Sequence, residues 1–332
     1  MVSIPHANPQ NKRPRIFISI ASFCDPLLIF TVRNAVKMAQ HPERLCFGIV
    51  DQSQTSSEAD LPAGPWRIAS LHVPPHQSRG ACWARSLAMT FYAGEEYFFQ
   101  IDSHSCFDQG WDVTLIDALE TIAQRNQNPK VILSTRPFAF EIDETQTIKT
   151  TRFTDCTLKL VPKKSELHLS DPVLSFACYN SKQMNDLQGF QISAANVFTR
   201  GSFVEEVPYD PFFYFHGEEQ NISIRAITSG WDIWHPNAVP LYHLYKKRST
   251  GEAPLHWDPQ FEAQRNEKWT ELRSRARTRL SQLISGRLNG VYGLGSVRTM
   301  QDYLQLSGLT LIPNTPATNH TPAIQAVPVR PS

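Results

Sequence analysis

The hydrophobic positions in the first 134 residues follow two alternating patterns. Short runs rich in β-branched and aromatic residues predict buried strands at 16–21, 46–50, 97–101 and 131–134. Between them, apolar residues recur at helical spacing in three segments: after Asp25-Pro26, over 81–93, and around Leu115, Leu119 and Ile122. We interpret Asp25-Pro26 as an N-cap followed by proline at N1. Strands alternating with helices are typical of a mostly parallel sheet covered by helices. We therefore expect an α/β fold.

The remaining segments are less regular. Residues 53–65 are rich in Ser, Thr and Pro, which predicts a loop. Residues 140–172 show little periodicity, and we expect them to form irregular segments around the edge of the sheet. A short helix is expected over 217–229, stopped by Gly230, and one long basic helix over 260–285. No internal repeat is visible.

These patterns predict one folded domain over residues 15–311. Residues 1–14 are polar and contain proline, and 312–332 are rich in Pro and Thr without a core-forming pattern, so both ends are expected to be disordered. The N-terminal residues contain no apolar stretch typical of a secretory signal, and no apolar run is long enough to span a membrane.

Composition narrows the class of protein. Hydrophobic residues make up 41% and charged residues 19%, which is typical of a globular protein with ample core material. The formal net charge of +1 provides no field that would attract nucleic acid or a membrane. Six cysteines occur without a CxxC pair, which argues against a structural zinc site and a disulfide scaffold. We expect a cytoplasmic protein with reduced thiols.

Polar residues follow three of the predicted strands. Ala21 and Ser22 come after the first, Asp51 after the second, and Asp102 and His104 after the third. Ligand sites in parallel sheets lie at the carboxyl ends of the strands, so these residues should converge on a bound nucleotide.

Asp102 and His104 form a DSH sequence directly behind a strongly apolar strand. A turn aspartate beside a surface histidine is one reading. A divalent-metal site is the other, because Mn²⁺ accepts mixed carboxylate and imidazole ligands and can neutralise phosphate charge. His243 is the candidate third ligand, although it could equally be a structural histidine. The basic residues that follow it suit a flap over a diphosphate: Lys246, Lys247 and Arg248.

The segment from Arg79 to Arg85 predicts an anion contact. Gly80 permits a tight entry into the helix, and Arg85 lies one turn inside it. Arginines near a helix start commonly bind phosphate. An exposed helix arginine is the alternative.

Glu218 and Glu219 follow the aromatic run 211–216 at the start of a predicted helix. Acidic residues at this position oppose the helix dipole, and the rings could belong to the core. Aromatic faces beside carboxylates are also typical of carbohydrate sites, where rings stack on sugars and carboxylates accept hydroxyl hydrogen bonds.

Taken together, these segments resemble the glycosyltransferase family of cytosolic polypeptide N-acetylglucosaminyltransferases. The resemblance runs in order from about residue 15 to 308 and rests on SIASFCDP, HPERLCFGIVDQ, RGACWAR, EEYFFQIDSHSCFDQGWD, FHGEEQNISIRAITSGWDIWHPN, YHLY and GLGSVRTMQDYLQLSG. That family attaches GlcNAc in α-linkage to hydroxyproline of a ubiquitin-ligase subunit. The spacing of the DSH, the Gly-Glu-Glu block and the later histidine is also similar to that of the polypeptide GalNAc-transferases.

The resemblance implies a GT-A fold, a Rossmann-like fold for nucleotide sugars, with a UDP-sugar donor and Mn²⁺ or Mg²⁺. It further implies transfer with retention of anomeric configuration to a hydroxyl of a protein or glycan acceptor. Position by position, it implies that the metal and the diphosphate are bound by Asp102, His104 and His243. Glu218 and Glu219 would contact the donor and acceptor sugars, and Arg85 would contact the donor.

Two other functions are compatible with these residues. A metal-dependent nucleotide or phosphoester hydrolase could use the same Asp and His ligands, although a two-metal hydrolase would need more carboxylates nearby. The second alternative function is a non-catalytic glycan- or protein-binding module with a vestigial site. The DSH, the Gly-Glu-Glu block and His243 are all intact, which favours an active transferase.

Overall fold

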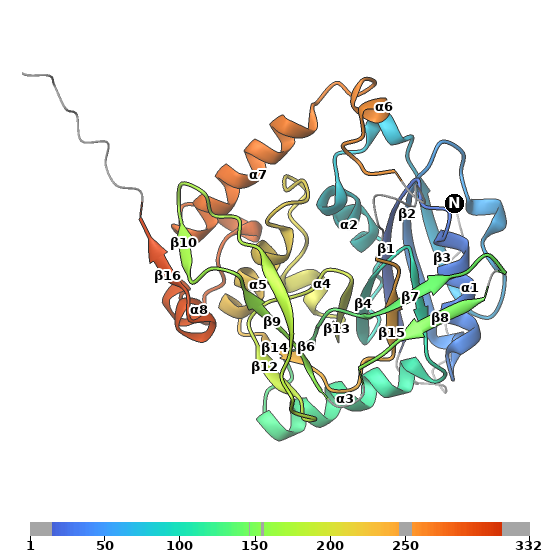
Figure 1. The fold of residues 1–332 in the computed structure, drawn as a ribbon, viewed down its shortest axis with the longest axis horizontal. Coiled ribbons are helices and arrows are strands. Elements are labelled where there is room, and N and C mark those ends of the chain that lie inside the picture. The colour runs from blue at the N-terminus through green and yellow to red at the C-terminus, as the bar shows by residue number, and fades with distance from the viewer. Residues whose placement is uncertain (1–14, 146, 154–155, 246–253, 314–332) are drawn as a thin grey trace, which may run out of the picture.

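The computed structural model describes residues 15–145, 147–153, 156–245 and 254–313. Its centre is an eight-stranded sheet, made of β1 (Ile16–Phe23), β2 (Leu45–Gln52), β3 (Arg67–His72), β4 (Tyr97–Asp102), β6 (Val131–Leu133), β12 (Leu187–Gly189), β13 (Asn196–Arg200) and β14 (Asp232–His235). The strand order is β12-β14-β6-β13-β4-β1-β2-β3 (Figure 1). Strands β3, β2, β1 and β4 run parallel to one another, and β14 is parallel to β6. β13 and β12 are antiparallel to their neighbours. The predicted mostly parallel sheet is confirmed.

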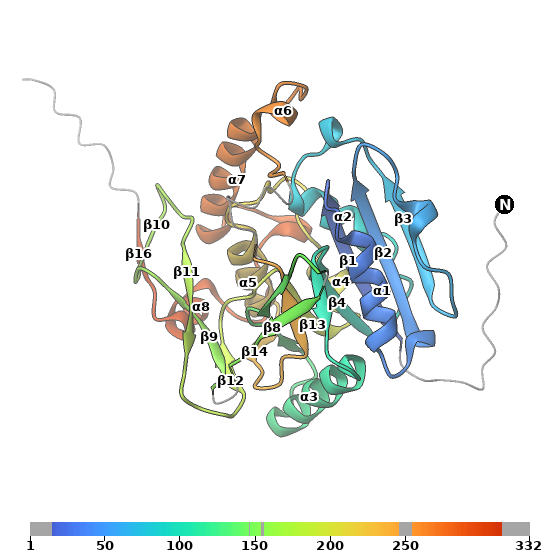
Figure 2. The same ribbon diagram turned by 45° about the vertical axis from the view of Figure 1, so that its right-hand side comes forward.

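Helices cover both faces of this sheet. On one face, Ile16, Ile18 and Ile20 of β1 belong to a core shared with α1 (Leu28–Met38) and α3 (Trp111–Asn126). Phe17 points to the other face, where the core includes residues of α2 (Ala81–Met89), α5 (Glu218–Thr228) and α7 (Trp269–Ile284). Figure 2 shows α1 lying across β1 and β2. Because successive strand residues face opposite sides, β1 needs apolar residues at nearly every position, as its sequence has.

The smaller elements extend the edges of this frame. A four-stranded sheet has the order β5-β15-β7-β8, and two strand pairs join β9 with β11 and β10 with β16. Their bounds are β5 (Ser105–Phe107), β7 (Phe138–Ile142), β8 (Ile148–Thr151), β9 (Leu158–Pro162), β10 (Glu166–His168), β11 (Phe176–Asn180), β15 (Leu241–His243) and β16 (Thr310–Ile312). The short helices are α4 (Phe203–Glu206), α6 (Pro259–Glu262) and α8 (Met300–Ser307), with single 3₁₀ turns at Pro42–Arg44, Glu58–Asp60, Pro75–Gln77 and Gly290–Tyr292. Within the described ranges, no helix has the length and apolar character needed to cross a membrane.

Two predicted helices differ from those observed. The helix expected over 81–93 ends at Met89, where the Thr90 hydroxyl donates to the Leu87 carbonyl oxygen (2.7 Å) and so competes with the helical pattern. The helix expected over 260–285 is two helices, α6 and α7. The break is stabilised by Glu262, whose carboxylate accepts the Trp269 N–H (3.1 Å).

Two boundaries and one strand also differ from the prediction. Asp25 is not the N-cap of α1, because the helix begins at Leu28 and no side chain caps it. Strand β3 was not predicted. Ile312, expected in the tail, belongs to β16, which pairs with β10. The predicted disorder of residues 1–14 and of the segment after Pro313 lies outside the described residues.

Candidate active site

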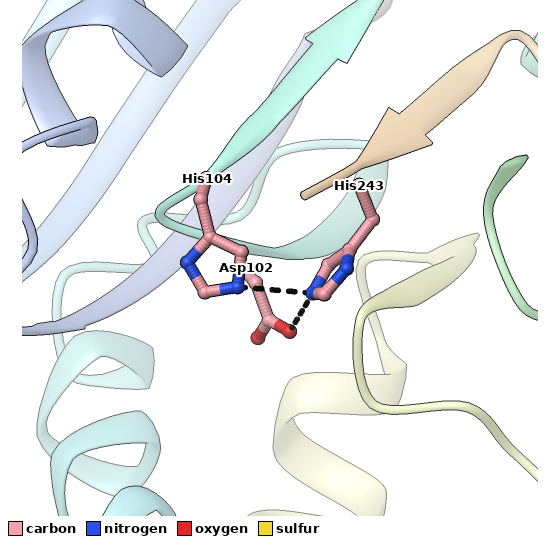
Figure 3. A group of neighbouring side chains, drawn as sticks. All are labelled: Asp102, His104 and His243. Atoms are coloured by element: carbon pink, nitrogen blue, oxygen red, sulfur yellow. Dashed lines mark hydrogen bonds and ion pairs between the residues drawn. The ribbon is translucent and has the colours of Figure 1, made fainter. Parts of the chain in front are cut away.

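Three predicted metal ligands meet at the carboxyl end of β4. Asp102 is the last residue of β4, His104 lies in the turn that follows, and His243 is the last residue of β15. Figure 3 shows their side chains pointing toward one another. Nε2 of His243 lies 3.0 Å from Nε2 of His104 and 3.1 Å from Oδ2 of Asp102. One ligand atom from each residue lies within 4.8 Å of the others, so a single ion could contact all three.

Strand pairing brings His243 to this point. β15 is antiparallel to β5, with His243 opposite Ser105, the residue after His104. The turn before β5 is held by Thr31 of α1, whose hydroxyl donates to the Ser103 carbonyl oxygen (2.8 Å) and accepts the Ser105 N–H (2.9 Å). Helix α1, the turn and β15 therefore fix both histidines before any ligand binds.

The chemistry of these side chains fits a divalent cation. Nδ1 of His104 lies 2.5 Å from Oδ2 of Asp25, so the proton of the neutral ring belongs on Nδ1. The Nε2 lone pair then faces His243 and Asp102. A carboxylate behind a ligand histidine is the usual arrangement around bound metals in proteins. The cluster therefore offers two imidazole nitrogens and one carboxylate oxygen to a cation.

Asp102 is kept ionised. Burial alone would raise its pKa, but the hydrogen bond to His243 and the positive charge of Arg85 hold the pKa well below the usual range. The carboxylate is thus a charged ligand at every pH at which the protein would work.

Arg85 connects the cluster to α5. Its guanidinium donates to Oδ1 of Asp102 (2.8 Å) and forms an ion pair with Glu218, and the residue is only 5% exposed. Burial would lower the arginine pKa, but Glu218 and then Tyr209 and Asp102 raise it well above the usual value. The low exposure excludes a solvent-facing helix arginine. Arg85 instead holds two acidic side chains in place.

Glu218 and Glu219 occupy different environments although they are adjacent. Glu218 begins α5 and is buried beside Arg85. Glu219 is partly exposed, and its Oε1 accepts the Ala194 N–H (2.8 Å). Burial, which outweighs that hydrogen bond, raises the pKa of Glu219 to about 7. Glu218 is therefore held by an ion pair with Arg85, whereas Glu219 changes charge near neutral pH.

Gly217, which precedes them, has a φ of 86°, in the left-handed region that favours glycine. A Cβ at this position would lie 3.0 Å from the Leu280 side chain. Both constraints set the direction in which the chain enters α5.

The strand-end residues lie near this point, with different exposures. Ala21 is opposite Asp102 in the sheet register and lines a cavity. Ser22 is fully buried and does not line this cavity. Asp51 is also buried, and its carboxylate binds the Ser53 hydroxyl and the Ser57 N–H, so it holds the loop after β2.

One predicted ligand contact does not join the group. The Arg79 side chain is 61% exposed and lies 3.7 Å from Glu267, in a groove beside Trp83 rather than with the ligand cluster. Lys246 lies outside the described residues.

Two cavities meet at the cluster, and Arg85, Asp102, Phe215, His243 and Tyr245 line both. The β1 cavity, of about 350 Å³, extends along the ends of β1 and β2 and is also lined by Phe23, Gln52 and His256. The α5 cavity, of about 550 Å³, extends the other way and is also lined by Glu218, Glu219, Arg136 and Lys163. The ligand cluster therefore stands at the junction of two binding spaces.

His256 was not predicted and closes one side of the β1 cavity. Its Nδ1 accepts the Tyr214 hydroxyl (2.8 Å), and its Nε2 lies 2.8 Å from the Ser78 hydroxyl, which donates to the Gln52 side chain (2.5 Å). Burial and the charge of Arg265 lower the pKa of His256 to about 3, so the ring is neutral. In this series of hydrogen bonds each donor then meets an acceptor. Asp25 was also missed as a site residue, because the Asp-Pro pair resembles a helix start.

Solved structures share the fold. A structure of GalNAc-T7 with UDP, GalNAc and Mn²⁺ matches with a TM-score of 0.54 and 13% identity, over 72% of this chain and 45% of that chain. Two structures of S. aureus TarS 1–349, one of them in complex with UDP-GlcNAc, match with TM-scores of 0.41 and 0.40 and identities of 12% and 13%. They cover 69% and 70% of this chain and 60% and 59% of TarS 1–349. The GalNAc-T7 match shows the GT-A type α/β fold.

The chain thus spans less than two thirds of these solved chains. No curated protein sequence matches it. A sequence model described as Glycosyltransferase (GlcNAc) matches residues 15–65 and 63–312, nearly the whole described chain. The protein therefore belongs to this glycosyltransferase (GlcNAc) family.

Proposed function

We propose that the protein is a metal-dependent retaining glycosyltransferase that transfers a sugar, with GlcNAc favoured, from a UDP-sugar to a hydroxyl of a protein or glycan. The observation that carries this proposal is the cluster of Asp102, His104 and His243 at the junction of two cavities. A donor that spans the junction would have its nucleoside in one cavity, its diphosphate at the cluster and its sugar in the other.

The β1 cavity suits the nucleoside. Phe23 provides an aromatic surface, and Gln52 and His256 present a neutral, fully hydrogen-bonded wall without a charge that would repel a base. The GalNAc-T7 structure, which holds UDP, GalNAc and Mn²⁺, supports a donor of this class. The family description supports GlcNAc as the sugar.

Asp102, His104 and His243 would hold Mn²⁺ or Mg²⁺. When bound, this cation neutralises diphosphate charge and stabilises UDP as a leaving group. Asp25 orients His104 for this role through Nδ1, and Arg85 keeps Asp102 aimed at the junction.

The transfer itself exchanges one bond for another. The acceptor hydroxyl oxygen forms a bond to the anomeric carbon, while the bond from that carbon to the β-phosphate oxygen breaks and its electron pair leaves with UDP. The hydroxyl proton passes to the departing phosphate oxygen, which lies on the same face of the sugar when configuration is retained. Glu218 is held rigidly by Arg85, so its charge opposes the positive charge on the anomeric carbon without reorganisation.

Glu219 is suited to the acceptor side. With a pKa of about 7 it can accept or donate a hydrogen bond to a sugar hydroxyl near neutral pH. Transfer to hydroxyproline, the reaction of the subfamily that the sequence resembles, stays a prediction.

UDP release from a panel of UDP-sugars tests the proposal, with Mn²⁺ or Mg²⁺ present and with chelator as control. We expect slow, metal-dependent release of UDP from one preferred donor. Release of phosphate from simple phosphoesters without a sugar preference would support a hydrolase instead. Absence of both activities and of UDP binding would leave only a binding module.

A further inference from the structure

The lining of the α5 cavity contains two positively charged residues to which the proposed function assigns no role. Arg136 follows β6 and Lys163 follows β9, and both side chains line the cavity and are exposed to solvent. Neither lines the β1 cavity. They therefore face the part of the site that lies beyond the ligand cluster.

Deeper in the cavity, the positive charge of Arg85 is already engaged by carboxylates. Arg85 is paired with both Asp102 and Glu218. By contrast, among the described residues neither Arg136 nor Lys163 has a carboxylate at ion-pair distance. Arg136 and Lys163 are therefore exposed positive charges of this cavity that no described carboxylate neutralises by an ion pair.

Arg136 lies against an aromatic ring at the cavity wall. Its guanidinium carbon lies 5.4 Å from the centre of the Tyr245 ring. Tyr245 is itself fixed, because its hydroxyl donates to the Pro137 carbonyl oxygen (2.7 Å) and its ring lies 4.5 Å from that of His243. Stacking leaves the guanidinium edge and its N–H donors available for a planar anion such as a carboxylate.

An exposed aromatic surface lies at the same opening. Phe215 lines both cavities and is 47% exposed. Its ring packs edge-on against Trp257 (5.5 Å between centroids) and His216 (5.4 Å). Burial and then the charges of Arg273 and Arg277 lower the pKa of His216, so its ring is uncharged at neutral pH. Exposed rings supported in this way provide a flat surface for the C–H face of a sugar.

From these features we propose that the acceptor is an anionic carbohydrate, with its acidic group bound by Arg136 and Lys163 and a neighbouring sugar ring on Phe215. This inference rests on the proposed function and names the substrate class of the same site. A carboxylate and a phosphate would both satisfy the two cations, and a peptide hydroxyl is the competing acceptor.

The test compares matched acceptors. The protein is incubated with Mn²⁺ and the UDP-sugar that it hydrolyses, together with a glucuronate-containing oligosaccharide, a phosphorylated one, a neutral one of equal length, or a peptide containing serine and hydroxyproline. The readout is the ratio of sugar transferred to donor hydrolysed, measured by mass spectrometry. We expect one of the acidic oligosaccharides to exceed the neutral one by about 10-fold, as one charge-assisted contact implies.

Variants identify the residues responsible. Replacing both cations, R136Q with K163Q, should reduce the preference for the acidic acceptor to about 2-fold or less. The matched control K164Q removes an exposed neighbouring charge that does not line the cavity and should keep the full preference. Preferential modification of the peptide or the neutral sugar would overturn the proposal, as would donor hydrolysis without transfer to any oligosaccharide.

Two further outcomes separate this inference from the proposed function. If the double variant weakens UDP binding and leaves the acceptor preference intact, Arg136 and Lys163 bind the diphosphate and the acceptor proposal is wrong. If the wild-type protein releases no UDP from any UDP-sugar, the proposed function fails, and the acceptor proposal fails with it.

Discussion

The two cavities differ in how their walls are built. The β1 cavity lies at the ends of two central parallel strands, and four of its neighbouring polar side chains form one hydrogen-bonded series, from Tyr214 through His256 and Ser78 to Gln52. The α5 cavity is lined by residues from short edge strands and loops, including exposed Arg136 and Lys163. Away from the ligand cluster, the first cavity has a fixed, uncharged wall, whereas the second has exposed charged side chains that can still bind a ligand. We expect this difference if the β1 cavity always binds the same nucleotide, whereas the α5 cavity binds the acceptor.

Asp102 is shared by both cavities, and its replacement should have the largest effect. Asp102→Ala should lower turnover by about 10³-fold and weaken UDP binding in the presence of Mn²⁺, because the site loses its only charged ligand and Arg85 loses a partner. Single-turnover kinetics and calorimetric UDP titration measure the two effects. Asp117→Ala, on the exposed side of α3, is the matched control. Undiminished activity in Asp102→Ala would remove the metal from the proposal.

Glu218 separates charge from binding. Glu218→Gln keeps the size of the side chain and one hydrogen-bond acceptor for Arg85 but loses the negative charge near the anomeric carbon. We expect kcat to fall by about 10²-fold, the loss typical of one preorganised electrostatic group, with the Kd for UDP near that of wild type. A fall in UDP affinity that matches the loss in kcat would instead make Glu218 a structural residue of the helix start.

The sequence located residues that follow a strongly patterned strand better than residues that complete the cavity walls, for a physical reason. Asp102 and His104 directly follow an apolar strand, so local pattern and sheet topology together locate them. His243 was reached only as a candidate, since its position depends on β15 pairing with β5 across more than a hundred residues. Arg136 and Lys163 follow short strands whose partners are distant, and no local pattern marks them.

The same limit applies to the fold. The central strands and the first helices were predicted to within a few residues, because burial on both faces leaves a continuous apolar run. Asp25 resembled an N-cap, and only the tertiary structure brings its second carboxylate oxygen to His104. The division of α6 from α7 depends on Glu262 reaching across the break, a contact that helical periodicity does not reveal.

Glu219 allows a test of the α5 side without any substrate. Its pKa is about 7 in the folded protein and 4.5 by default, so folding favours the protonated acid. The stability that this provides is complete below about pH 4.5 and is lost as the pH rises through about 7. Glu219→Gln does not titrate, so its advantage in unfolding free energy over wild type should grow by about 2 kcal/mol from pH 5 to pH 8, with allowance for partial exposure.

Denaturant unfolding of both proteins at the two pH values, in metal-free buffer, measures this difference. Glu120→Gln is a control, because Glu120 is a partly exposed carboxylate paired with Arg200 and lies on α3, away from both cavities. Parallel stability curves for wild type and Glu219→Gln would show that Glu219 keeps an ordinary carboxylate pKa.

His256 provides the smallest expected effect and the most specific one for the β1 cavity. His256→Ala removes both contacts in the middle of the hydrogen-bond chain, so Tyr214 and Ser78 lose a buried partner and the wall becomes free to move. Because one unsatisfied buried group costs about 1–3 kcal/mol, we expect the Kd for UDP to rise by about 10-fold. The ratio of transfer to donor hydrolysis should stay constant, since the acceptor lies in the other cavity. His256→Gln, which can restore one of the two hydrogen bonds, should recover part of the UDP affinity.

If His256→Ala lowers the Tm but leaves the Kd for UDP unchanged, the chain of hydrogen bonds only supports the fold and the nucleoside does not bind beside it. If it alters acceptor preference instead, the two cavities are not divided between nucleotide and acceptor as proposed.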